Sequence, residues 1–185
     1  KETVSKEYGE YKHSFVVDKN WKDKIINLVF EGSMTDTEVR INGKLAGEIH
    51  QGSFYVFKYD ISKLIKYGQK NLLEVKVSKH SSNASVNAAE READYWILGG
   101  IFRPVYLEAL PKTYISRLSI DARADGSYRS RILHSGSANE ISMQVYDQQG
   151  KPFGQVVKQK VDSDSTWLNL NFSKPKLWSA EFPNR

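Results

Sequence analysis

Three acidic side chains, Glu90, Glu92 and Asp94, stand close together near the middle of the chain, and Arg103 follows them. Two carboxylates about 5 to 5.5 Å apart can cleave a glycosidic bond, but spacing in a sequence does not establish such a pair. Because lone acidic side chains are rarely buried, we interpret Glu90 and Glu92 as solvated loop charges. An ionised Asp94 only accepts hydrogen bonds, which suits hydroxyl groups. The alternative is that it caps a turn or pairs with the planar guanidinium of Arg103.

The residues next to Asp94 are aromatic or glycine. Tyr95 and Trp96 offer aromatic faces that suit a sugar ring, and packing in a core is the equal alternative because aromatic side chains bury large areas. Gly99 and Gly100 allow a positive φ or close packing beside this loop. They are not a phosphate-binding loop, because no helix follows them.

Metal and cofactor sites are disfavoured. The chain has no cysteine, which excludes disulfides, thiolate catalysis and a cysteine-based zinc site. Its four histidines lie far apart, without the spacing of metal ligands: His13, His50, His80 and His134. No nucleotide-binding loop occurs. We therefore expect no cofactor.

The composition is that of a folded chain, with 39% hydrophobic and 12% aromatic residues among 185. The net charge is +5, but lysines and arginines are scattered along the sequence rather than clustered to follow a phosphate backbone, so we expect no nucleic acid. No run approaches the roughly 20 apolar residues that span a bilayer, so we expect no membrane partner. The first residues lack the apolar core of a signal peptide, and the compartment stays open.

Alternation of apolar and polar residues dominates, which predicts strands with one face in a core and the other in solvent. The clearest such segments are 39–41, 73–77, 118–122, 141–145 and 168–172. Asn42-Gly43 is a two-residue hairpin turn. Helical periodicity is nearly absent, and the polar stretch 79–92 reads as a long loop that leads to Asp94.

Short strands at regular intervals without helices between them predict antiparallel sandwiches. The predicted strand 105–109 closes one block of strands, and Pro111 breaks the pattern before the next begins. The sequence therefore predicts two domains, 1–110 and 111–185.

The segment 94–107 resembles the signature of family 2 glycoside hydrolases, an aspartate followed by Gly-Ile-aromatic-Arg and a Val-x-Leu strand. Other family features occur in the same order along the chain: Phe30-Glu31-Gly32, the hairpin at Asn42-Gly43, the strand at 73–77, and Trp178 with Pro183. The similarity covers nearly the whole chain.

The resemblance implies an all-β chain, in which a galactose-binding-like jelly-roll sandwich precedes an immunoglobulin-like sandwich that lacks its final strands. In the family, a (β/α)8 barrel carries both catalytic glutamates, and a barrel needs about 250 residues. We therefore expect a non-catalytic fragment of a β-galactosidase or related retaining exo-glycosidase. By the same resemblance, Asp94 binds a terminal β-linked sugar at the mouth of the protein's own C-terminal barrel, and Arg103 steadies it.

The resemblance also favours a periplasmic or secreted enzyme, and family members often assemble as homo-oligomers through these sandwiches. Two other functions compete with a glycosidase fragment. A stand-alone carbohydrate-binding module requires a usable sugar site without the barrel. An immunoglobulin-type adhesion protein would leave the 94–107 signature unexplained.

Overall fold

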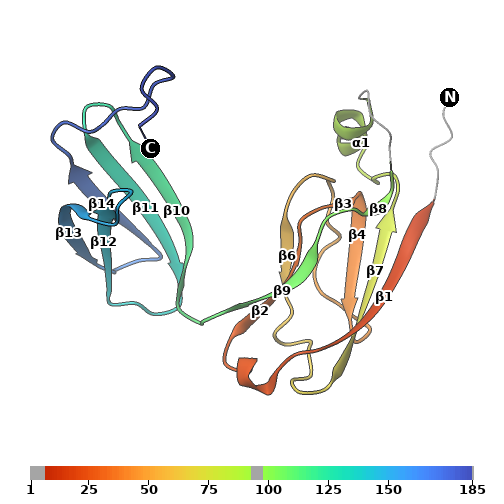
Figure 1. The fold of residues 1–185 in the computed structure, drawn as a ribbon. Coiled ribbons are helices and arrows are strands. Elements are labelled where there is room, and N and C mark those ends of the chain that lie inside the picture. The colour runs from red at the N-terminus through yellow and green to blue at the C-terminus, as the bar shows by residue number, and fades with distance from the viewer. Residues whose placement is uncertain (1–6, 93–97, 185) are drawn as a thin grey trace. The chain divides into compact units, whose positions relative to one another are not determined.

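A computed structural model describes residues 7–92 and 98–184, which form two compact units, Lys1–Pro111 and Lys112–Arg185 (Figure 1). Each unit is built almost entirely from antiparallel strands. The all-β prediction is therefore confirmed. Among the described residues, no helix has the length and apolar character needed to cross a membrane.

Among its described residues, 7–92 and 98–111, the first unit has nine strands, one helix and one short 3-10 helix. They are β1 Tyr8–Val16, η1 Lys19–Trp21, β2 Ile25–Phe30, β3 Ser33–Met34, β4 Asp36–Ile41, β5 Lys44–Leu45, β6 Phe57–Asp60, β7 Lys70–Ser78, α1 Ala84–Arg91, β8 Gly100–Ile101 and β9 Val105–Leu110. One sheet has the order β1-β7-β4-β5, a second has the order β6-β2-β9, and β3 pairs with β8.

Alternation along the strands builds the core of the first unit. In β7, Leu73, Val75 and Val77 are buried while the residues between them are not, as the two-residue period of a strand requires. Val39 and Ile41 of β4 join them in one cluster with the apolar residues of β2. The predicted strands at 39–41 and 73–77 thus form as expected.

The Asn42-Gly43 hairpin is confirmed. Both residues have positive φ, at 52° and 80°, and Ile41 pairs with Lys44 across them. This is the two-residue loop whose twist matches antiparallel strands. The Asn42 side chain also donates to the Asn71 amide oxygen at 2.9 Å, which ties the turn to β7.

The second unit is a sandwich of three strands facing two. Its strands are β10 Tyr114–Ala122, β11 Ser127–Ser135, β12 Glu140–Tyr146, β13 Pro152–Lys160 and β14 Ser165–Asn171. The sheets have the orders β10-β11-β14 and β12-β13. Ile132, Ile141 and Leu168 form the buried core between them.

One burial prediction in the second unit is wrong. Leu118 and Ile120 form a strand as predicted, but their side chains are 51% and 56% exposed. They lie opposite Ile132 and Ser130, both buried, and residues opposite each other share a face of the sheet. Leu118 and Ile120 therefore point to the core side, where no described strand covers them.

The predicted loop at 79–92 is also wrong in part, because it contains the helix α1. Asn83 caps this helix, its side chain accepting from the Ser85 amide at 3.0 Å. The alanines at 84, 88 and 89 favour a helix, and an asparagine before them favours a helix start. These local signals favour a helix, but the segment lacks the regular apolar spacing on which the prediction of helices relied.

Candidate functional site

The helix α1 lies directly before residues 93–97 and is held by polar contacts. None of its residues is buried, and an isolated helix of eight residues has little stability in water. Contacts at its two ends therefore decide where it lies. One contact involves Asp36 of β4, and the other involves Glu90 within the helix.

Asp36 fixes the start of the helix. One of its carboxylate oxygens accepts from the Ser81 hydroxyl at 2.5 Å, and the other accepts from the Ser82 amide and hydroxyl, both at 2.8 Å. The carboxylate is almost fully buried, so its charge is stabilised mainly by these bonds. Asp36 thereby joins β4 to the two residues before the capping Asn83.

Glu90 fixes the end of the helix. The prediction that it is a solvated loop charge is therefore wrong. Its carboxylate accepts from the Ser53 amide at 2.9 and 3.0 Å and from the Ser53 hydroxyl at 2.7 Å. These residues are 37 positions apart, so no local pattern predicts the contact. Glu92, by contrast, is exposed, as expected.

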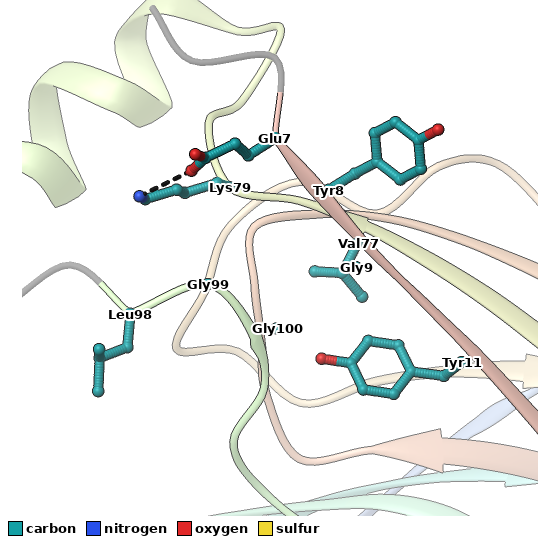
Figure 2. Close-up of a pocket in the computed structure, with 9 residues that line it drawn as sticks. All are labelled: Glu7, Tyr8, Gly9, Tyr11, Val77, Lys79, Leu98, Gly99 and Gly100. Carbon is teal, nitrogen blue, oxygen red and sulfur yellow. Dashed lines mark hydrogen bonds and ion pairs between the residues drawn. The ribbon is translucent and has the colours of Figure 1, made fainter.

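A hollow of about 290 Å³ lies beside β1, β7 and residues 98–100 (Figure 2). It includes the predicted site residues Gly99 and Gly100, and the Tyr11 ring points toward them. Lys79 and Glu7 form an ion pair of 2.9 Å at its rim. Tyr11 was not predicted as a neighbour of Gly100, because β1 is far from Gly100 in the chain.

Gly100 has the positive φ predicted for it, at 106°. A Cβ atom there would lie 2.3 Å from the Tyr11 hydroxyl oxygen, and that oxygen accepts from the Ile101 amide at 3.4 Å. Gly99 differs, because a Cβ atom would meet only ordinary contacts with Lys79. Only Gly100 therefore requires glycine for its conformation and close approach.

Arg103 holds the neighbouring loops through backbone carbonyls. Its guanidinium donates to the carbonyl oxygens of Glu31 and Phe54, both at 3.3 Å, and lies 5.2 Å from the centre of the Phe102 ring. Phe102 in turn contacts Phe54 edge to face, with ring centres 6.1 Å apart. Arg103 thus joins the residue after β2, the loop after Gly52 and the segment before β9.

The three predicted sugar-contacting residues Asp94, Tyr95 and Trp96 lie outside the described residues. The pairing of Arg103 with Asp94 is therefore still a prediction. What the structure does describe is the frame at both ends of this segment, formed by α1 on one side and by Leu98, Gly99 and Gly100 on the other.

His50 lies beside this frame in an apolar stack. Its ring stacks on Phe57 with centres 3.7 Å apart, and Phe57 stacks on Phe30. Its Nε2 lies 3.0 Å from the Gly52 carbonyl, and since a carbonyl only accepts, Nε2 carries the proton. Burial lowers the pKa of His50 below 6.5, outweighing the Gly52 carbonyl and the charges of Glu90 and Asp36.

Within residues 7–92 and 98–184, no group of three histidine, aspartate or glutamate side chains gathers to hold a metal ion. The chemistry that the described frame provides is hydrogen bonding and aromatic contact. These contacts are made between groups of the protein itself, so they hold α1 and the neighbouring loops in place.

The first unit matches the family model described as glycosyl hydrolases family 2, sugar binding domain, over residues 2–111. Among curated relatives, a beta-galactosidase of Thermoanaerobacter pseudethanolicus is 29% identical over 182 residues, covering 94% of this chain and 24% of the relative. A beta-galactosidase of Clostridium acetobutylicum is 29% identical over 191 residues, covering 98% of this chain and 20% of the relative. The chain thus spans between a fifth and a quarter of the length of these relatives.

Solved structures share the fold. Bacteroides uniformis beta-glucuronidase 2, covalently bound to cyclophellitol-6-carboxylate aziridine, matches with a TM-score of 0.81 and 21% identity over 97% of this chain and 23% of its own. Bifidobacterium dentium beta-glucuronidase, complexed with coumarin-3-O-glucuronide, matches with a TM-score of 0.79 and 20% identity over 95% and 34%.

Proposed function

Because the chain belongs to glycosyl hydrolases family 2, we propose that it is the non-catalytic N-terminal part of a longer glycosidase. In this proposal, the first unit supports and completes the sugar-binding site of a (β/α)8 barrel elsewhere in the protein. The two catalytic carboxylates lie in that barrel, about 5 to 5.5 Å apart as retention of configuration requires. The substrate is a terminal β-linked sugar, with galactose and glucuronic acid the candidates that the relatives' names suggest.

The anchored frame around residues 93–97 is the observation that carries the proposal. Asp36 and Glu90 clamp a helix that buries no residue of its own. A sandwich does not need such a helix for its core, so we assign the clamp to the placement of the segment that follows it. Asp94 would then accept hydrogen bonds from sugar hydroxyls, with Tyr95 and Trp96 facing the ring.

Two apolar surfaces support the presence of further chain in the complete protein. Leu118 and Ile120 face the core side of the second unit without cover from any described strand. In the first unit, a groove of about 640 Å³ between β1 and β9 is lined largely by apolar side chains, Phe15 and Leu107 among them. Apolar surface of this kind is stabilised when other chain covers it.

Hydrolysis of nitrophenyl β-galactoside and nitrophenyl β-glucuronide tests the proposal. We expect the 185-residue chain to be inert and the longer protein to be active. In the longer protein, Asp94→Asn should lower kcat/KM by roughly 10- to 100-fold, the scale of a lost charge-assisted hydrogen bond, while Glu92→Gln should leave it unchanged. Turnover by the 185-residue chain would refute a non-catalytic role.

A stand-alone carbohydrate-binding module is the second candidate, and the hollow beside Gly100 is the observation in its favour (Figure 2). Calorimetric titration of the 185-residue chain with galactose distinguishes the two. We expect no measurable heat, because the proposal places most of the sugar site in the barrel. Saturable binding would instead favour the module.

A further inference from the structure

The outer face of the larger sheet in the second unit carries a tryptophan between two arginines. Arg131 of β11 lies directly opposite Trp167 of β14. The guanidinium carbons of Arg129 and Arg131 lie 4.1 and 5.8 Å from the centre of the Trp167 ring. The alternate residues Ile132 and Leu168 are buried, so the two arginines and the tryptophan point away from the core.

The tryptophan holds both arginines ready for a ligand. A cation over an aromatic face is attracted to it, which restricts two long side chains before any ligand binds and lowers the entropy lost on binding. Both arginines are exposed. In residues 7–92 and 98–184, neither guanidinium donates a hydrogen bond to the protein, so the donor edges remain for an anion. The planar fork of arginine matches a carboxylate in two-point contact.

The acidic residue opposite Arg129 makes its hydrogen bonds to another arginine. Asp121 lies opposite Arg129 on the neighbouring strand β10, but its carboxylate accepts from Arg123, whose Nη2 is 2.9 Å and Nε 3.1 Å away. This hydrogen-bonded partner lowers the pKa of Asp121, and Arg129 contributes less. The positive charge of Arg129 and Arg131 therefore stays directed to solvent.

Two amides extend the same face along β14. Asn169 and Asn171 follow Trp167 at intervals of two, so all three lie on one side of the strand, and all three are exposed. Amide groups both donate to and accept from hydroxyls. The neighbouring apolar residue Leu168 points inward, so Trp167 is the one large apolar side chain among these exposed residues of β14.

We propose that this surface, formed by Arg129, Arg131, Trp167, Asn169 and Asn171 and called here the arginine face, binds an acidic polysaccharide. The two arginines, about 7 Å apart along the strand, take carboxylates of the glycan. The asparagine amides take its hydroxyl groups. The arginine face requires neither the barrel nor hydrolysis, so its test is independent of the proposed function.

Amide NMR of the 185-residue chain, titrated at low salt with a galacturonate tetramer, tests the arginine face. A β-1,4-galactotetraose, which has hydroxyls but no carboxylates, is the matched ligand. We expect the acidic tetramer to shift resonances of β11 and β14, and the neutral tetramer to bind at least about 10-fold more weakly, as the loss of charge-assisted bonds implies.

Substitutions of charged residues distinguish binding at a defined site from an effect of the net charge of the chain. Arg129→Gln with Arg131→Gln should weaken binding at least about 10-fold. Lys151→Gln with Lys160→Gln removes the same charge from exposed positions around β13 and should change it less than about twofold. Trp167→Thr keeps every charge but removes the ring that orders the arginines, and it should also weaken binding.

Several outcomes would overturn the proposal. If the arginine and lysine double variants weaken binding of the galacturonate tetramer equally, the binding depends on overall charge and not on the arginine face. Shifts confined to the first unit would place the ligand elsewhere. A glutamate-rich peptide that binds the arginine face while the galacturonate tetramer does not would identify an acidic protein as the partner instead.

Discussion

At the scale of single residues, the frame around residues 93–97 depends on a few side chains with demanding surroundings. Glu90 meets three donor contacts from Ser53, and Gly100 has a positive φ against the Tyr11 hydroxyl. Each has a residue of the same type within two positions that lacks those constraints, Glu92 for Glu90 and Gly99 for Gly100. The chain thus offers a matched control for each substitution.

Glu90→Gln should loosen α1 without unfolding the first unit. Replacing the carboxylate by an amide turns charge-assisted bonds into neutral ones, a loss of about 1 kcal/mol. Hydrogen exchange of the amides at 87–91 should therefore accelerate roughly fivefold, while amides of β7 keep their rates. Glu92→Gln should leave both unchanged. If the amides at 87–91 exchange at the same rate in the Glu90 variant as in the unmodified chain, Glu90 does not fix the helix.

Gly100→Ala should destabilise the first unit by about 1 to 3 kcal/mol. The new methyl group forces a non-glycine residue into a strained φ, and it displaces the Tyr11 hydroxyl from the Ile101 amide. Urea unfolding, followed by Tyr and Trp fluorescence, measures the change. Gly99→Ala should cost much less, and a similar loss in the two variants would contradict the assigned role of Gly100.

At the scale of elements, the stack of His50, Phe57 and Phe30 couples the loop after β5 to the core of the first unit. The lowered pKa of His50 makes this coupling sensitive to pH. Between the folded-state pKa and 6.5, the unfolded chain binds more protons than the folded one. Stability from this residue is therefore complete above 6.5 and is lost as the pH falls through the folded-state pKa.

Thermal unfolding at pH 7.5 and pH 5.5 checks this sign. The drop in Tm of the first unit on acidification should be smaller in His50→Gln than in the unmodified chain, because the glutamine cannot take up the proton. His13→Gln, at an exposed position of β1, is the control and should keep the full drop. A full drop in the His50 variant would assign the acid sensitivity to other groups.

At the scale of the whole molecule, no element within residues 112–184 covers β10 on the core side of the second unit. Ser130 of β11 lies 3.7 Å from the Met143 sulfur of β12, and Phe153 of β13 stacks on Phe172, which follows β14. Thus β12 covers β11 and β13 covers β14. A further strand paired with the other edge of β12 would lie over Leu118 and Ile120.

In the 185-residue chain, this open face should promote self-association. Leu118→Lys with Ile120→Lys places charges on it and should reduce the concentration-dependent increase in mass measured by light scattering. Tm should change little, because both side chains are already more than half exposed. Trp178→Lys, which also replaces an exposed apolar side chain, should leave the association unchanged. Association that persists in the double variant would implicate another surface.

The amino-acid sequence by itself determined the strands, the Asn42-Gly43 hairpin and the family signature. These depend on alternation, turn chemistry and short motifs, all of which act between neighbouring residues. The position of α1 was decided by tertiary structure, because Glu90 meets Ser53 only after the chain has folded back across 37 residues.

The sequence alone also did not determine the register between paired strands, nor which strand faces another element covers. Arg129 and Arg131 meet Trp167 only because β11 pairs with β14 in one register, although all three residues looked scattered along the chain. Leu118 and Ile120 alternate like core residues, yet they are exposed. Alternation determines which face of a strand is apolar, whereas burial depends on whether another element covers that face.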